Sequence, residues 1–128
     1  MIQANENERQ IIDILKKNGF EVTREMVFGH KWIVDLFGER EDTVLLVELK
    51  SGAPVSHADI FDLVALRNSQ QFRNKNTKCF IINTGKFELG KDSPIMKVAE
   101  AGNITIIYGE NLSDIIDELN SIIARSLS

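Results

Sequence analysis

The chain of 128 residues is 43% hydrophobic and 27% charged, close to the average of globular proteins, and has no apolar run of the roughly 18 residues that a membrane span needs. Its single cysteine, Cys79, excludes an internal disulfide, and its polar N-terminus shows no secretory signal, so we expect a cytoplasmic protein without membrane contact. The net charge of −4 argues against a protein that coats nucleic acid indiscriminately.

The hydrophobic pattern predicts an alternation of helices and strands. A helix is expected over 5–18, followed by a weaker strand over 20–28. Two strands come next, at 32–38 and 43–50, joined by a polar hairpin turn at 38–42. The remaining expected elements are a helix over 57–73, a strand over 78–83, a helix over 92–101, a strand over 104–108 and a helix over 112–125.

Neither an internal repeat nor a Pro/Gly-rich linker interrupts this order, so residues 1–128 are interpreted as one domain. The three consecutive strands of the front half allow an antiparallel meander. The alternation of the back half requires crossovers and parallel pairing. The sequence therefore predicts an α/β fold with a mixed central sheet and helices on both faces.

Two acids of the front half occupy apolar surroundings. Asp35 interrupts an apolar run and alternates in phase with Ile33 and Phe37. Glu8 falls on the same helical stripe as Leu15, which predicts that it faces the sheet. The structural alternatives are a turn residue for Asp35 and, for Glu8, a first-turn acid favoured by the helix dipole.

Glu48 and Lys50 end a strand that is otherwise apolar on both faces. Residues two apart share a face of a strand, so this pair points the same way as Val44 and Leu46. A charged pair in such a place is costly unless something compensates it, and an ion pair at the strand end is one explanation. The other is a magnesium-type site at one end of the sheet, because Mg²⁺ is held by one or two carboxylates together with water and phosphate oxygens.

The run IVDLFGEREDTVLLVELKSG resembles the PD-(D/E)XK nuclease motif, in which an acid on one strand of a hairpin precedes Glu-x-Lys on the next. Val34 stands where the motif has proline. The stretch NERQIIDILKKNGFEV is similar to the first helix of archaeal Holliday junction resolvases, with Glu8 ahead of the pair Gly19–Phe20. The resemblance implies a restriction endonuclease-like fold and a Mg²⁺- or Mn²⁺-dependent endonuclease that hydrolyses phosphodiester bonds in DNA, with branched DNA among its substrates.

The resemblance also implies a role for each residue. Asp35 and Glu48 would hold the metal, helped by the backbone carbonyl of Leu49. Glu8 would hold a second metal or a metal-bound water, and Lys50 would position the attacking water. A homodimer is implied as well, and specificity would come from DNA shape, from this dimer or from a protein partner. The candidate nucleic-acid contacts are His30, Lys31, Ser51, His57, Arg67, Gln70 and Gln71.

Two other hypotheses remain open. A nuclease-fold module could bind nucleic acid or a protein partner without cleaving. A nucleotide-binding switch could use Gly85–Lys91, whose GxxxxGK spacing is that of a phosphate loop, although Asp92 stands where Ser or Thr would bind magnesium. The basic segment from Arg67 to Lys86 is either a phosphate contact or a solvated helix end. The sequence leaves the substrate open among a junction, a restriction site, a flap and RNA.

Overall fold

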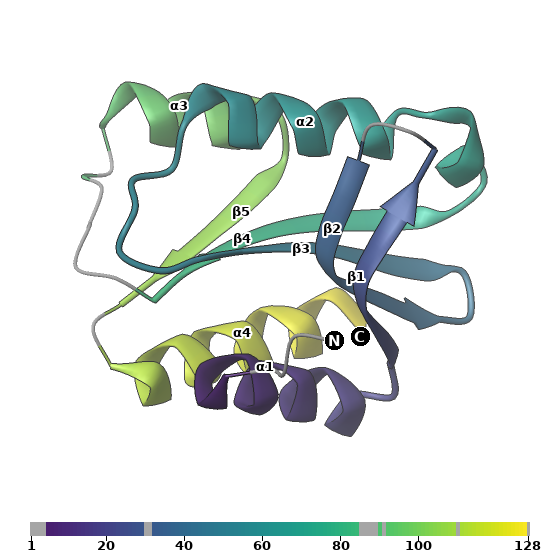
Figure 1. Cartoon of the computed structure of the whole chain (residues 1–128), viewed down its shortest axis with the longest axis horizontal. Helices are drawn as coiled ribbons and strands as arrows, with labels where there is room; N and C mark the ends of the chain where they lie inside the picture. Colours follow the sequence, from purple (N-terminus) through teal and green to yellow (C-terminus); the bar gives the residue numbers. More distant parts are fainter. Residues whose placement is uncertain (1–4, 30–31, 85–89, 91, 110, 128) are drawn as a thin grey trace.

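The computed structural model describes residues 5–29, 32–84, 90, 92–109 and 111–127, and its elements follow the predicted order (Figure 1). They are α1 (Glu6–Lys17), β1 (Glu21–Phe28), β2 (Trp32–Arg40), β3 (Thr43–Lys50), α2 (His57–Arg67), a single 3-10 turn η1 (Gln70–Phe72), β4 (Asn76–Asn83), α3 (Pro94–Ala101), β5 (Ile104–Tyr108) and α4 (Leu112–Leu127). Among the described residues, no helix is long and apolar enough to cross a membrane.

The five strands form one sheet in the order β1-β2-β3-β4-β5. β1, β2 and β3 pair as an antiparallel meander, whereas β3, β4 and β5 are parallel and are joined through α2 and α3. Figure 1 shows α2 and α3 on one face of the sheet and α1 and α4 on the other. The predicted α/β fold with a mixed sheet and helices on both faces is therefore confirmed.

The sheet separates two apolar cores. On β3, Val44 and Leu46 pack on the side of α2 and α3, and Leu45 and Val47 pack on the side of α1 and α4. Because both faces of this strand are covered, its apolar run is continuous, as expected of a central strand in a parallel sheet. The charged end of β3 is thus the point where the sheet emerges from between the two helical layers.

Three helices begin at a capping side chain. Asn5, Ser56 and Ser93 each accept a hydrogen bond from a backbone N–H of the first turn, in α1, α2 and α3 respectively. Pro94 follows as the first residue of α3, where its missing N–H costs nothing. These caps fix the residue at which each of the three helices starts.

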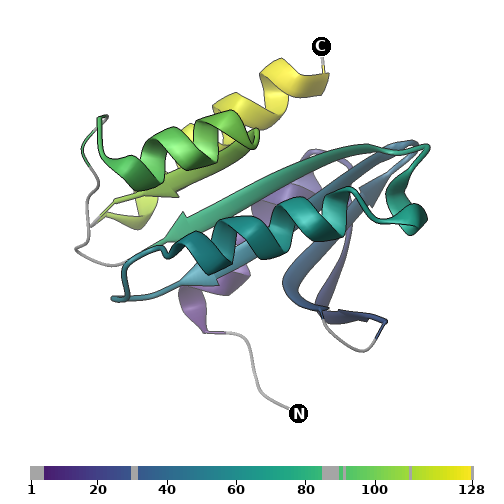
Figure 2. The ribbon, with the colours of Figure 1, turned by 90° about the horizontal axis from the view of Figure 1, so that it is seen from above.

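The hairpin of β1 and β2 changes face halfway along. Val22 packs in the core on the α1 side, whereas Met26 packs on the α2 side, and Leu36 and Val34 of β2 differ in the same way. Residues two or four apart in a strand normally share a face. The side chains of β1 therefore change face between Val22 and Met26, and those of β2 between Val34 and Leu36. Glu25, at the reversal, has a φ of 53°, in the left-handed region. Figure 1 shows the far ends of β1 and β2 rising toward α2, and Figure 2 shows the same hairpin swinging away from the other strands.

In β2 the change of face occurs at Asp35, and one prediction about this residue is therefore wrong. Ile33 is exposed while Phe37 is buried on the α2 side, so the two do not share a face and the predicted in-phase alternation is wrong. The ladder between β2 and β3 also stops here, because its last pair is Leu36↔Val47. Asp35 therefore lies where β2 separates from β3.

The predicted hairpin turn at 38–42 is too long. β2 continues to Arg40, which pairs with Thr43, so the turn has only two residues. Its first residue, Glu41, has a φ of 53°. A two-residue connection fixes the register of the hairpin, and with it the positions of the strand ends.

The predicted helix over 57–73 is also too long. α2 ends at Arg67, and the Ser69 hydroxyl donates to the Leu66 carbonyl at 2.6 Å. This local hydrogen bond satisfies one of the last carbonyls of the helix and competes with its continuation. Gln70 and Gln71 consequently lie on η1 and not on the helix.

The tip of the hairpin is anchored by Phe28, whose ring packs edge-on against Phe37 and Phe72 with centroids 5.1 Å and 5.2 Å away. Phe28→Ala is expected to lower the free energy of unfolding by about 3–5 kcal/mol, measured by chemical denaturation. Val27→Ala is the matched control, because Val27 is 58% exposed, and should cost under about 0.5 kcal/mol. Equal losses in the two variants would show that the tip is not held by this aromatic cluster.

Candidate active site

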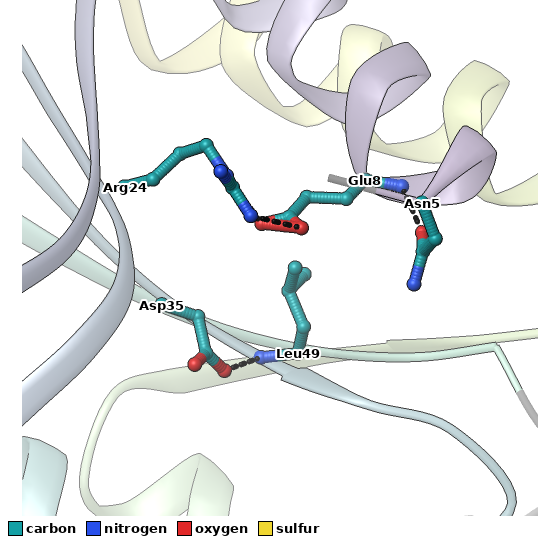
Figure 3. A network of polar contacts seen from close by, with 5 residues as sticks. All are labelled: Asn5, Glu8, Arg24, Asp35 and Leu49. Atoms are coloured by element: carbon teal, nitrogen blue, oxygen red, sulfur yellow. Dashed lines mark hydrogen bonds and ion pairs between the residues drawn. The ribbon is translucent and has the colours of Figure 1, made fainter. Parts of the chain in front are cut away.

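The carboxyl groups of Asp35 and Glu48 lie side by side where β2 separates from β3. The backbone N–H of Leu49, beyond the last pair of the ladder, donates to Asp35 Oδ2 at 2.7 Å (Figure 3). The Asp35 carboxylate thus takes the place of a strand carbonyl. This contact brings Asp35 next to Glu48, with which it shares a hydrogen bond.

The Glu48 carboxyl retains a proton near neutral pH. Burial, the charge of Asp35 and their shared hydrogen bond raise the pKa of Glu48 to about 8. The carboxylate of Asp59 adds to this rise in the pKa, while the ammonium of Lys50 opposes it. A half-buried carboxyl that keeps its proton beside a second acid is a place where a cation can substitute for that proton.

Lys50 is held by α2. Its Nζ lies 2.9 Å from Asp59 Oδ2, and the two side chains are 23% and 18% exposed. Asp59 is also the acid of the α2 capping box: it accepts from the Ser56 N–H at 2.8 Å while its own N–H donates to Ser56 Oγ at 3.2 Å. Burial alone would raise the pKa of Asp59, but hydrogen bonds from Ser56 and Lys50 lower it.

Glu8 faces the sheet, as its helical stripe predicted, and is engaged by β1. Its carboxylate accepts from Arg24 Nε at 3.0 Å and from the second guanidinium nitrogen at 3.2 Å (Figure 3). The Glu8 side chain is 13% exposed. The hydrogen bond with Glu8 raises the pKa of Arg24. The predicted third acid is therefore near the site but paired with an arginine.

Two clefts adjoin the carboxyl pair. One of about 250 Å³ is lined by residues that include Glu8, Arg24, Asp35, Leu49, Lys50 and Ser51. A smaller one of about 140 Å³ is lined by residues that include Trp32, Glu48, Asp59 and Asp62. Because Asp35 lines the first and Glu48 the second, the pair lies between the two clefts. A larger groove, of about 910 Å³, lies elsewhere, around the starts of β4 and β5.

The donor set fits a hard divalent cation in part. Within the described ranges, no three His, Cys, Asp or Glu side chains come together as a ready-made metal site. Asp35 and Glu48 nevertheless supply two adjacent carboxylates, which is what Mg²⁺ commonly receives from a protein. In a strand, the N–H and C=O of one residue point to the same neighbour, so the Leu49 carbonyl lies on the edge that its N–H shares with Asp35.

Sequence reasoning missed two residues of this arrangement, Arg24 and Asp59. The signal for Asp59 was available: Ser56-x-x-Asp59 ahead of an apolar run is a capping-box pattern, which places the acid at the start of a helix. The position of Arg24 depends on which face of β1 it occupies. Arg24 shares the α1 face with Val22, and only the reversal at Glu25 separates it from Met26 on the other face, which the sequence pattern did not show.

The predicted nucleic-acid contacts fall into two groups. Ser51 lines the cleft of Glu8 and Asp35, and His57 is the exposed first residue of α2. Arg67 donates to the Asn103 carbonyl, beside the start of β5, and the two glutamines of η1 precede β4. β3 and β4 are parallel, so the starts of β4 and β5 lie at the opposite end of the sheet from Lys50, which ends β3. At ~3.3 Å per residue, this separation is about 20 Å. His30, Lys31 and, apart from Gly90, the loop Gly85–Lys91 lie outside the described residues.

A five-stranded mixed sheet whose leading hairpin separates from the central strand beside a pair of acids is a restriction endonuclease-like fold. Residues 3–61 match the family described as archaeal Holliday junction resolvase. The match covers a little under half of the chain and includes Glu8, Asp35, Glu48 and Lys50, so the predicted resemblance is confirmed. No curated protein sequence matches the chain.

Solved structures show the same fold. A protein from Vibrio cholerae superposes with a TM-score of 0.65 at 12% identity, over 92% of this chain and 32% of its own. A repair endonuclease from Pyrococcus abyssi has a TM-score of 0.55 at 20% identity, over 86% of this chain and 50% of its own. The endonuclease EndoMS, in a complex with double-stranded DNA, has a TM-score of 0.55 at 19% identity, over 86% and 47%. The chain spans about a third of the first protein and about half of the other two.

The raised pKa of Glu48 predicts a pH dependence of stability in EDTA. Its folded pKa of about 8 exceeds the ordinary value of 4.5, so the folded state binds more protons between these limits. The contribution of Glu48 is therefore most favourable at the acid end and declines as pH rises from 4.5 to 8. Chemical denaturation across this range should show that Glu48→Gln removes the decline. Identical pH profiles of wild type and Glu48→Gln would contradict the proton-sharing pair.

Proposed function

We propose that this protein is a divalent-cation-dependent endonuclease that hydrolyses phosphodiester bonds in DNA. The observation that carries the proposal is the Asp35–Glu48 pair, which is held together at the strand separation by the Leu49 N–H. The match to the resolvase family over residues 3–61 and the fold shared with two endonucleases support it. Branched DNA is the proposed substrate class, because the matched family acts on junctions by its description.

Asp35, Glu48 and the Leu49 carbonyl are the proposed ligands of Mg²⁺ or Mn²⁺. A bound ion of this kind polarises a phosphoryl oxygen and lowers the pKa of bound water. The fold holds the carboxyl groups of Asp35 and Glu48 together before any ion binds, and the raised pKa of Glu48 keeps a proton there. A cation that replaces the proton relieves their repulsion, so metal binding and proton release are coupled.

Lys50 is the proposed water-positioning group. An ammonium has three donors, and Asp59 occupies one of them, which leaves donors for the attacking water and a phosphate oxygen. When water attacks phosphorus and the bond to the leaving sugar oxygen breaks, negative charge grows on the phosphoryl oxygens. A fixed positive charge beside them stabilises that transition state more than the ground state.

Glu8 is the proposed third acid, and it reaches a second cation only if Arg24 releases it. Arg24 lines the same cleft as Asp35, and its planar guanidinium suits a phosphate as well as it suits a carboxylate. Entry of a DNA phosphate into this cleft would therefore compete with the Glu8–Arg24 pair. Exchange of Arg24 from Glu8 to phosphate would leave Glu8 available to the cation.

A second candidate function is a nuclease-fold module that binds nucleic acid or a protein partner without cutting. The engagement of both Glu8 and Lys50 in ion pairs favours it, because neither is presented unpaired to a substrate in this structure. The two functions differ in their response to cations. Mg²⁺ or Mn²⁺ should activate the nuclease and leave the affinity of the binding module unchanged.

Lys50→Ala separates these functions. Cleavage of plasmid and four-way-junction DNA in Mg²⁺ or Mn²⁺ should fall about 100-fold, as expected when one preorganised charge is lost from a transition state. DNA affinity in Ca²⁺ should change little, since one cation is a small part of the backbone contact. Lys78→Ala, at the other end of the sheet, is the matched control and should cut normally. The catalytic role fails if Lys50→Ala cuts as fast as wild type, or if wild type cuts no DNA with either metal.

We also propose a homodimer, because one small domain offers limited area for gripping a duplex and symmetric pairs are the commonest oligomers. Light scattering at assay concentrations should report twice the mass of the 14.5 kDa chain. A monomeric mass together with full cleavage activity would refute the dimer and leave the nuclease proposal standing.

A further inference from the structure

Asp59 connects the start of α2 to the end of β3. A single oxygen, Oδ2, accepts both from the Ser56 backbone N–H at 2.8 Å and from Lys50 Nζ at 2.9 Å. The first contact belongs to the capping box and fixes the carboxylate relative to the helix. The second therefore gives the lysine an acceptor whose position is set by the helix start.

The backbone on both sides of this contact is also fixed. The Lys50 carbonyl accepts from the Thr84 N–H at 2.9 Å, which ties the end of β3 to the residue after β4. The Asn83 side chain, in a residue that is 1% exposed, donates to the Ala53 carbonyl at 2.9 Å and holds the connection between β3 and α2. The gap that the Lys50–Asp59 pair bridges is thus set by hydrogen bonds on both sides of it.

The pair also joins the two clefts of the site. Lys50 lines the cleft that contains Asp35, and Asp59 lines the one that contains Glu48. α2 already has its cap in Ser56, so the helix start does not need the lysine. A lysine side chain is a flexible four-carbon stem, and an acceptor at a fixed position limits the directions in which its ammonium can point.

We propose that Asp59 is a positioning residue for the cleavage reaction, holding the Lys50 ammonium in the cleft of Asp35. The proposal rests on the nuclease function proposed above. Asp59 touches neither substrate nor metal in this scheme and acts through Lys50. Removal of the Asp59 charge leaves Lys50 in place but allows its ammonium to turn toward solvent. The orientation in which the ammonium points into the cleft of Asp35 then becomes one of several.

A double-mutant cycle with Lys50→Ala tests this role. Asp59→Asn should lower kcat roughly 10- to 100-fold with KM nearly unchanged, as when an outer partner that orients a site group is lost. In the Lys50→Ala background the same substitution should have no further effect, because its target is gone. Asp59→Glu should recover part of the activity. Ser56→Ala, which removes the cap hydroxyl but keeps the backbone N–H, should lower Tm and leave kcat nearly unchanged.

A second readout needs no cleavage. The rate of Lys50 acetylation by acetic anhydride, followed by mass spectrometry in protein without metal or DNA, should rise several-fold in Asp59→Asn, with the exposed Lys97 as internal reference. An unchanged Lys50 rate overturns the proposal. So does an Asp59→Asn variant that cuts at the wild-type rate or faster, since Asp59 would then be neutral or would withhold the lysine. A wild type that cuts no DNA overturns the nuclease function and this catalytic role together, and the acetylation rates then decide separately whether Asp59 holds Lys50.

Discussion

The arrangement of the site depends on one hydrogen bond, from the Leu49 N–H to Asp35 Oδ2. β2 pairs with β3 only from Leu36 onward, so the N–H of Leu49 has no strand carbonyl opposite it. A part-buried N–H left without an acceptor costs about 1–3 kcal/mol. The Asp35 carboxylate accepts the hydrogen bond from this N–H, and the same contact places Asp35 next to Glu48. The separation of two strands thus produces both the opening of the site and its pair of acids.

The charges around this pair are balanced by residues from four elements. Glu8 of α1 meets Arg24 of β1, and Lys50 of β3 meets Asp59 of α2. Glu48 of β3, next to Asp35 of β2, instead has its pKa raised to about 8, mainly by burial and by the charge of Asp35. The fold therefore keeps these two carboxyl groups at the centre and places two ion pairs around them. A phosphate and a metal would meet opposite charges already held in position.

The sequence predicted what depends on periodicity. The two-residue spacing of Glu48 and Lys50 was enough to place both side chains on the face of Val44 and Leu46, which packs against α2 in the structure. The helical stripe of Glu8 placed it toward the sheet. Periodicity did not predict the change of face at Asp35. Apolar residues flank Asp35 on both sides, so the pattern fits with its side chain on either face of the sheet. Arg24 was missed because its partner Glu8 lies 16 residues away in the sequence, on a different element.

Asp35 and Glu48 are proposed to form a cation site. Anomalous diffraction from crystals soaked in Mn²⁺ tests it most directly, because the ion is located without reference to activity. The account predicts an anomalous peak between the two carboxyl groups, beside the Leu49 carbonyl, which disappears in Asp35→Asn crystals. A Mn²⁺-saturated crystal without that peak, in which Asp35 and Glu48 still share their hydrogen bond, would contradict it.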